Sequence, residues 1–470
     1  MRENGDQAWR ARLVDLAERL HDIPVTEEET GERDGLVDLI TGYTLPRVEA
    51  PTLPLVAAVT GPSGVGKSFL VNALAGATVS AEGVIRPTTT LPVAVAGEPG
   101  IAEPLRERLE AEGATVTAAP PGRLEEVTLV DLPAASGSAE AAVLADLVLV
   151  VVSPARYADA SVWDALGSFG DAGVPVWLVT NRMAPELEAD LGRRLDGSGL
   201  APRLFPLGRR EGDHVAGAEE LAEALASASA DEAWRAKMLE DRLGRIAAGA
   251  AALVDDLDAT RSVGAGLLGI ATGHYARVRD RIDGAITSVA SGGGGTAWPA
   301  VAERLVALLT HRVGSAAGAT AEEWSRDPQG HGLLEGGGAG LWRHGPSTDV
   351  SLAAALRDWP ESTEDEVAGA LRRRPSPARL EKMAALVRDR ALGADGPVSW
   401  LVRRRFRNGI DGAVAAARAS LAEAIATVVD EDEARFAAAL GPLPTEEQLA
   451  GIRSDLATWA AVEGEAPGDA

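Results

Sequence analysis

The chain has 470 residues, 46% of them hydrophobic and 24% charged, which is typical of a folded globular protein with more than one core. Its net charge of −25 argues against a general nucleic-acid-binding protein, because such proteins need a broad basic surface. The absence of cysteine excludes disulfides, thiol catalysis and cysteine-ligated metals.

The first residues of the chain and its hydropathy indicate where in the cell the protein is expected. Residues 1–7 lack an apolar segment behind a basic start, so no signal peptide is expected. No stretch reaches the roughly 18 apolar residues that span a bilayer. We therefore expect a cytoplasmic protein, in which any contact with the inner face of the membrane is peripheral.

The first part of the chain has apolar residues at helical spacing. Trp9, Leu13, Leu16 and Leu20 recur at helical intervals and predict a helix over 7–22, and a second helix is predicted over 32–41. Both precede the first strand-like run, so residues 1–50 are interpreted as an N-terminal helical appendage.

Residues 51–230 alternate short apolar runs with helical patterns. This alternation predicts an α/β fold, the doubly wound, mostly parallel sheet of a P-loop NTPase. The predicted strands cover 53–59, 91–95, 127–130, 147–152, 174–179 and 203–206. An inserted helix is predicted over 102–112, followed by an extra edge strand over 114–118.

After residue 230 the strand-like runs disappear. The predicted helices cover 231–260, 262–291, 298–317, 377–392, 400–438 and 446–462. We interpret 231–463 as an all-α helical bundle or stalk domain and 464–470 as a flexible tail. The glycine-rich stretches 292–295 and 330–347 are predicted to be loops or hinges.

The strongest chemical signal is the glycine-rich stretch 61–68, which fits G-x-x-x-x-G-K-[ST] between a predicted strand and a predicted helix. Backbone N–H groups of such a loop and the helix N-terminus bind phosphate oxygens. Lys67 is expected to reach the β- and γ-phosphates, and Ser68 to hold Mg²⁺. The sequence therefore predicts a nucleoside-phosphate site.

Two later positions carry candidate metal chemistry. Thr89, or else Thr90, follows the loop by about twenty residues and could bind Mg²⁺ and sense the γ-phosphate, although a polar turn would show the same pattern. Asp131 ends an apolar strand and is expected to bind Mg²⁺, although a helix cap is the alternative.

Asn181 ends another predicted strand. It could contact a purine base, brace the glycine loop, or simply cap the helix that Pro185 begins. The sequence leaves these alternatives open.

Together, these residues resemble the TRAFAC-class P-loop GTPases, in particular the Era-like and bacterial dynamin-like branch. The resemblance covers about residues 50–230 and includes uncharacterised actinobacterial GTPases with a helical C-terminal half. It implies binding of GTP and GDP, Mg²⁺ as cofactor, and slow hydrolysis with Lys67 and Thr89 as catalytic residues. The implied metal ligands are Ser68, Thr89 and Asp131. The implied nucleotide-binding residues are Gly61, Pro62, Ser63, Gly64, Val65, Gly66, Lys67, Ser68, Phe69, Asn181 and Arg182.

Three positions depart from this family's pattern. Ala134 replaces the glycine of D-x-x-G, Ala184 replaces the aspartate of N-K-x-D, and Ala135 stands where a water-orienting glutamine would follow. The alternatives are therefore a nucleotide-binding scaffold with little hydrolysis that acts with a partner GTPase, or an NTPase that accepts both ATP and GTP. An ATP-using kinase is a third alternative, disfavoured because no acceptor site is visible.

Two arginine clusters raise the question of partners. One is Arg372 to Arg374; the other is Arg403 to Arg405 with Arg407, beside Trp400, Leu401 and Phe406. Such residues can contact anionic lipid, but a solvated helix face that pairs with acidic neighbours has the same composition. A second copy of the chain and a sister GTPase are the other candidate partners, and no nucleic acid is expected.

Overall fold

The structure, a computed structural model, describes residues 2–50, 52–80, 91–97, 100–101, 103–111, 113–133, 145–171, 173–198, 202–211, 214–291, 298–336, 338–373, 375–393, 398–407 and 409–460. The chain forms two compact units. One consists of Met1–Leu257 with Pro444–Ala470, and the other of Asp258–Leu443. Both cuts fall inside the region predicted as one helical domain.

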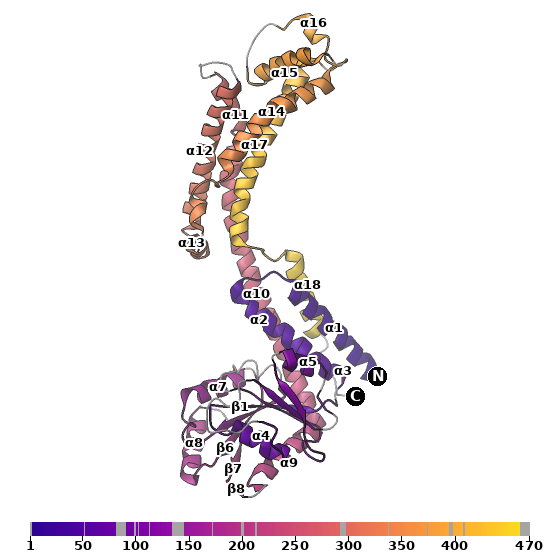
Figure 1. The fold of residues 1–470 in the computed structure, drawn as a ribbon, viewed down its shortest axis with the longest axis vertical. Helices are drawn as coiled ribbons and strands as arrows, with labels where there is room; N and C mark the ends of the chain where they lie inside the picture. Colours follow the sequence, from indigo (N-terminus) through magenta and orange to yellow (C-terminus); the bar gives the residue numbers. More distant parts are fainter. Residues whose placement is uncertain are drawn as a thin grey trace. The chain divides into compact units, whose positions relative to one another are not determined.

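The first unit contains a seven-stranded sheet in the order β3-β2-β4-β1-β5-β6-β7 (Figure 1). Its strands are β1 Leu55–Thr60, β2 Val93–Ala96, β3 Thr115–Ala118, β4 Val127–Asp131, β5 Leu147–Val152, β6 Val176–Asn181 and β7 Arg203–Leu207. Every neighbouring pair is parallel except β2 with β4. The predicted mostly parallel sheet and its extra edge strand are confirmed. A short hairpin follows, of β8 Arg210–Glu211 and β9 His214–Val215.

Helices cover both faces of this sheet. The faces are seen most clearly in β1, where Val56 and Ala58 join one buried cluster and Leu55, Ala57 and Val59 the other. The first cluster includes residues of α5 Glu103–Ala111, α7 Ala160–Asp171 and α8 Pro185–Ser198. The second includes residues of α4 Lys67–Ala75 and α9 Ala218–Ala230. All six residues of β5 are therefore buried, as its continuous apolar run predicts.

The N-terminal helices form a separate core within the first unit. They are α1 Arg2–Asp22, α2 Glu27–Asp38, the π-helical η1 Leu39–Thr44 and α3 Leu45–Glu49. Their apolar residues pack with Leu243 to Leu257 of α10 Glu232–Arg279 and with α18 Glu446–Ala460. The rings of Trp9 and Trp459 lie edge to face with centroids 5.1 Å apart.

A buried aspartate ties these helices to the sheet. Asp146 accepts hydrogen bonds from Tyr43 Oη at 2.6 Å, Arg47 Nε at 2.7 Å and Val56 N at 2.7 Å. Burial alone would raise the pKa of Asp146, but the Arg47 guanidinium and these hydrogen bonds hold it below its ordinary value. Arg242 of α10 lies over the Tyr43 ring with 4.6 Å between its Cζ and the ring centroid.

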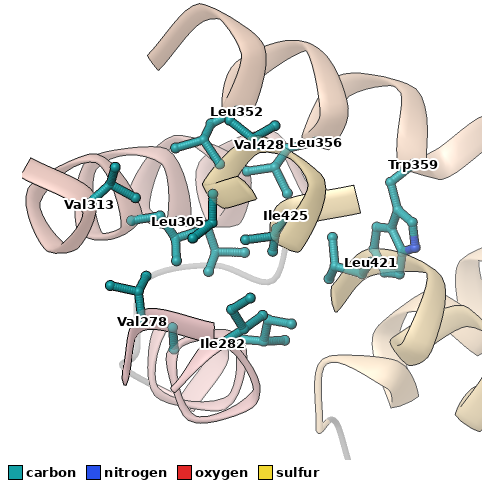
Figure 2. Packing of buried hydrophobic residues seen from close by; sticks show 14 of the residues in the cluster. Val278, Ile282, Leu305, Val313, Leu352, Leu356, Trp359, Leu421, Ile425 and Val428 are labelled. Carbon is teal, nitrogen blue, oxygen red and sulfur yellow. The ribbon is translucent and has the colours of Figure 1, made fainter. Parts of the chain in front are cut away.

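In its described residues, the second unit consists of helices, their connections and one isolated β-bridge. Besides the end of α10 it contains α11 Ile282–Ser291, α12 Trp298–Trp324, α13 Pro328–Glu335, η2 Gly338–Trp342, α14 Thr348–Ala370, α15 Pro377–Ala391, α16 Trp400–Arg403 and α17 Ile410–Leu440. Figure 2 shows how side chains of α10, α11, α12, α14 and α17 meet in one apolar core, with Leu305, Leu356 and Ile425 at its centre.

Several predictions in the helical region are wrong. α10 continues to Arg279 without a break near residue 261, because no proline stands there to interrupt it. The predicted loop over 330–347 contains α13 and η2, because Asp327 caps α13 and Pro328 opens it. α14 is absent from the predicted set, although its buried residues recur at helical spacing around Pro360. The predicted helix over 400–438 is interrupted between α16 and α17.

One helix within the described residues corrects the expectation about membrane spans. α17 is long and apolar enough to cross a bilayer, with a best 18-residue window of mean hydropathy 1.4. Its alanines raise the hydropathy without any long run of large apolar residues. The same helix buries Ala417, Leu421, Ile425 and Val429 along one side within the second unit.

Candidate functional site

The glycine loop follows β1 and leads directly into α4. Gly61, Gly64 and Gly66 have φ of 137°, 79° and 105°, a region that residues with a side chain rarely adopt. A Cβ on Gly61 would lie less than 3.0 Å from the carbonyl oxygen of Val151 on β5, and one on Gly66 equally close to the Asn181 amide. Glycine is therefore required at both ends of the loop.

Lys67 is curled over this loop. Its Nζ donates to Gly61 O at 2.9 Å and lies 3.4 Å from Pro62 O. Burial lowers the pKa of Lys67, and the negative charge of Asp131 opposes that shift. A partly desolvated ammonium on a ring of backbone groups can attract an anion strongly.

Two predicted metal ligands lie together at the start of α4. Ser68 Oγ donates to Asp131 Oδ2 at 2.8 Å, so the first helical turn and the end of β4 meet. Asp131 is fully buried, and its Oδ1 has no hydrogen-bond partner within the described residues. Burial raises the pKa of Asp131, while hydrogen bonds from Ser80 and Ser68 and the charge of Lys67 lower it.

This pair fits Mg²⁺. The ion prefers hard oxygen ligands and usually takes only one or two carboxylates, with substrate phosphates and water completing the shell. A hydroxyl and a buried carboxylate, one oxygen of which has no partner among the described residues, are such a donor set. Among the described residues, no three His, Asp or Glu side chains form a self-contained metal site.

Asn181 stands at the end of β6 and points at the glycine loop. Its Nδ2 donates to Val65 O at 2.7 Å, and its Oδ1 is buried without a partner in the described part of the chain. Of the three alternatives for Asn181, this contact corresponds to bracing the loop. Arg182 follows with φ 55°, and its Cζ lies 5.5 Å from the centroid of the Phe69 ring. Ala184 is exposed.

Several predicted positions fall outside the described residues. These are Thr89, Thr90, Ala134 and Ala135. The switch-type threonine and the altered D-x-x-G segment are therefore known here from the sequence alone.

Two polar residues of the site, Asn72 and Ser80, belong to none of the motifs identified in the sequence. Asn72 Oδ1 accepts from Val79 N and Ser80 N, both at 2.8 Å, and Ser80 Oγ donates to Asp131 Oδ2 at 2.7 Å. The available signal was Asn72, an amide among the apolar residues of the helix that follows the loop. A buried amide needs hydrogen-bond partners, so its presence there indicates a loop packed against it.

The two arginine clusters lie together in the second unit. Leu371 and Phe406 form an antiparallel bridge, with Arg372 N donating to Arg405 O at 2.9 Å. Phe406 is buried, whereas Trp400 is 64% and Leu401 57% exposed. Exposed guanidiniums therefore stand near an exposed apolar pair, and Arg374 lies outside the described residues.

Comparisons with known proteins give the following. No protein-family model matches the chain, and no curated protein matches it. Among solved structures, two chains of an oligomerised bacterial dynamin pair, described as a mechanism for long-range sensing and tethering of membranes, are 10% and 11% identical, with TM-scores of 0.32 and 0.31. They cover 93% and 98% of this chain, and it covers 96% and 95% of them. LeoA, a bacterial dynamin GTPase from ETEC, is 12% identical with a TM-score of 0.26. The match covers 98% of this chain and 94% of the LeoA chain. Scores this low carry no argument about the activity of this chain.

Proposed function

We propose that this chain is a guanine-nucleotide-binding P-loop protein of the dynamin-like or Era-like kind, which hydrolyses GTP slowly with Mg²⁺ and couples the nucleotide state to its helical part. The observation that carries the proposal is the convergence of Lys67, Ser68 and Asp131 at one glycine loop between β1 and α4. Two elements far apart in sequence meet here: α4 supplies the Lys67 ammonium and the Ser68 hydroxyl, and β4 supplies the Asp131 carboxylate, beside a loop whose N–H groups would bind phosphate.

Each residue has a defined task in this proposal. Lys67 would exchange its carbonyl contacts for the β- and γ-phosphates, and the loop N–H groups would bind the remaining phosphate oxygens. Ser68 and Asp131 would hold Mg²⁺, which supplies charge neutralisation on the phosphates when bound. Asn181 would keep the loop in shape through Val65, and Arg182 with Phe69 would border the base. Thr89 would complete the site as the switch residue.

The first experiment is equilibrium binding of GTP, GDP and ATP with Mg²⁺ to the full chain and to Lys67→Ala. Lys237→Ala is the matched control, because Lys237 is an exposed lysine on α10. A guanine preference that is lost in Lys67→Ala and kept in Lys237→Ala is expected. Absence of nucleotide binding by the wild type would overturn the proposal.

The same assay and a turnover measurement separate the alternatives. Equal affinity for ATP and GTP would show that Ala184 in place of an aspartate has removed base discrimination. Binding without measurable phosphate release would favour the scaffold that acts with a partner GTPase. Ala134 and Ala135 are the sequence features that favour this second candidate.

A peripheral membrane contact is the second part of the proposal. It rests on the surface formed by Trp400, Leu401 and the surrounding arginines, which we call the arginine tip. Among the described residues, no carboxylate forms an ion pair with the arginines of the tip, namely Arg372, Arg373, Arg403, Arg404, Arg405 and Arg407. This favours a contact with anionic lipid over a face that pairs with acidic neighbours. Exposed apolar and cationic side chains together suit an anionic lipid surface.

Vesicle sedimentation tests this part. Wild type is expected to bind vesicles containing phosphatidylserine and not those of phosphatidylcholine alone. Arg403→Glu with Arg404→Glu should abolish binding, since each arginine near the surface contributes about 1 kcal/mol. Trp342→Ala, at another exposed tryptophan of the same unit, is the control. Equal sedimentation of the charge-reversed variant would exclude the arginine tip.

A further inference from the structure

Ser80 contacts the proposed metal carboxylate without belonging to the phosphate-binding motif. Its hydroxyl donates to Asp131 Oδ2 at 2.7 Å, and Ser68 donates to the same oxygen at 2.8 Å. Ser80 is 2% exposed and Asp131 0% exposed, so water does not compete for these bonds. Both hydroxyls thus donate to Oδ2 of Asp131, and neither donates to Oδ1.

Asn72 fixes Ser80 in this position. The Asn72 side chain accepts from the N–H groups of Val79 and Ser80 and donates to Ser80 O, with all three distances 2.8 Å. Asn72 lies one helical turn after Ser68 on α4, so both residues share a face of the helix. One helix therefore presents one hydroxyl directly and a second through the amide of Asn72.

The consequence is a carboxylate with a fixed orientation. Two donors on Oδ2 hold the plane of the Asp131 carboxylate, and Oδ1 is the oxygen that keeps acceptor capacity. A desolvated carboxylate that rotated freely would present its oxygens to a cation only part of the time. Hydrogen-bond partners of metal-binding groups commonly set metal affinity in this way.

We propose that Ser80 is a positioning residue for Mg²⁺, whose hydroxyl orients Asp131 so that Oδ1 is available to the metal site. This inference rests on the proposed function, because it assumes that nucleotide and Mg²⁺ bind at this loop.

The test is Ser80→Ala in the full chain, with fluorescent GDP as the probe and Mg²⁺ titrated from zero in a chelating buffer. The Mg²⁺ concentration for half-maximal tightening of GDP binding should rise about tenfold or more. GDP affinity in chelator should stay within twofold of wild type. Thr78→Ala, which removes an exposed hydroxyl two residues away, should behave as wild type in both conditions.

A double variant separates positioning from a general structural role. If Ser80 acts through Asp131, then adding Ser80→Ala to Asp131→Asn should change the Mg²⁺ requirement by less than twofold. An equal loss of GDP affinity with and without Mg²⁺ would overturn the inference, as would an undiminished Ser80→Ala effect in the Asp131→Asn background.

The failures of the two proposals can be told apart. A wild type that binds no GDP, or binds it without any response to Mg²⁺, removes the proposed function and this inference together. A wild type that responds to Mg²⁺, beside a Ser80→Ala variant with the same response, removes only the role of Ser80.

Discussion

Two buried aspartates at opposite ends of the central parallel strands show how their partners decide what a carboxylate does. Asp146, just before β5, is satisfied by a guanidinium, a phenol and a backbone N–H, and its pKa is lowered. Asp131, at the end of β4, has two hydroxyl donors and an oxygen without a partner in the described residues, and its pKa is raised. The satisfied carboxylate stabilises the fold, whereas the incompletely satisfied one is suited to receive a cation.

The strongest way to break this comparison is Asp146→Ala. The change leaves the Arg47 guanidinium, whose side chain is 13% exposed, without its carboxylate and removes the acceptor of Tyr43. Removal of one member of a buried ion pair costs about 3–5 kcal/mol. Urea unfolding followed by circular dichroism measures it, and a loss below about 1 kcal/mol would contradict a structural role for Asp146.

Asp131→Asn should have the opposite profile. The amide keeps the shape of the side chain and removes a desolvated charge, so the stability of the ligand-free protein should be unchanged or higher. The Mg²⁺ affinity of the GDP complex should fall about 10- to 100-fold. Calorimetry with and without Mg²⁺ measures both effects. Destabilisation as large as that of Asp146→Ala would remove the distinction between the two sites.

The pH dependence of stability sharpens the same contrast. Because the folded-state pKa of Asp146 lies below its ordinary value of 3.8, the ionised carboxylate stabilises the fold fully above that pH. This contribution is lost as the pH falls below about 4 through the folded-state pKa. Acid titration of the unfolding midpoint should therefore slope more steeply below pH 4 in wild type than in Asp146→Ala. Parallel curves would show that Asp146 has no linkage to folding.

The smallest effect is expected at an exposed carboxylate. Glu322, in the last turn of α12, pairs at 2.8 Å with Arg326, which lies just after the end of the helix, and both side chains are more than half exposed. Glu322→Gln should change the free energy of unfolding by about 0.5 kcal/mol or less, and added salt should erase the difference. A loss comparable to that of Asp146→Ala would mean that burial does not separate these classes of carboxylate.

Most of the sheet could be predicted because a strand covered on both faces is a continuous apolar run, as in Leu147–Val152. The glycine loop could also be predicted, since its glycines, Lys67 and Ser68 are contiguous in the chain. Asn181 was found by its place after a strand, but its contact with Val65 could not be, because β6 and the loop are brought together only by the sheet order.

The helical region was harder to predict. Its residues are mostly alanine, leucine, arginine and glutamate, so the composition changes little between a helix and its neighbour. Glycine and proline, which usually indicate loops or helix ends, lie inside helices at several positions of this region. Gly332 and Gly338 belong to α13 and η2, and Pro360 lies within α14, next to Trp359, whose indole N–H donates to Ala417 O of α17.

The sequence by itself determined the candidate site: a glycine-rich loop, a lysine, a serine and an aspartate at a strand end, in the order that a nucleotide site would require. Only the tertiary structure decided which hydrogen-bond partners each buried polar group has. It joined Ser80 to Asp131 through Asn72, and it gave Asp146 its partners from the N-terminal helices. The physical reason is that residue type and order are local, whereas burial and hydrogen-bond satisfaction depend on segments that meet only when the chain is folded.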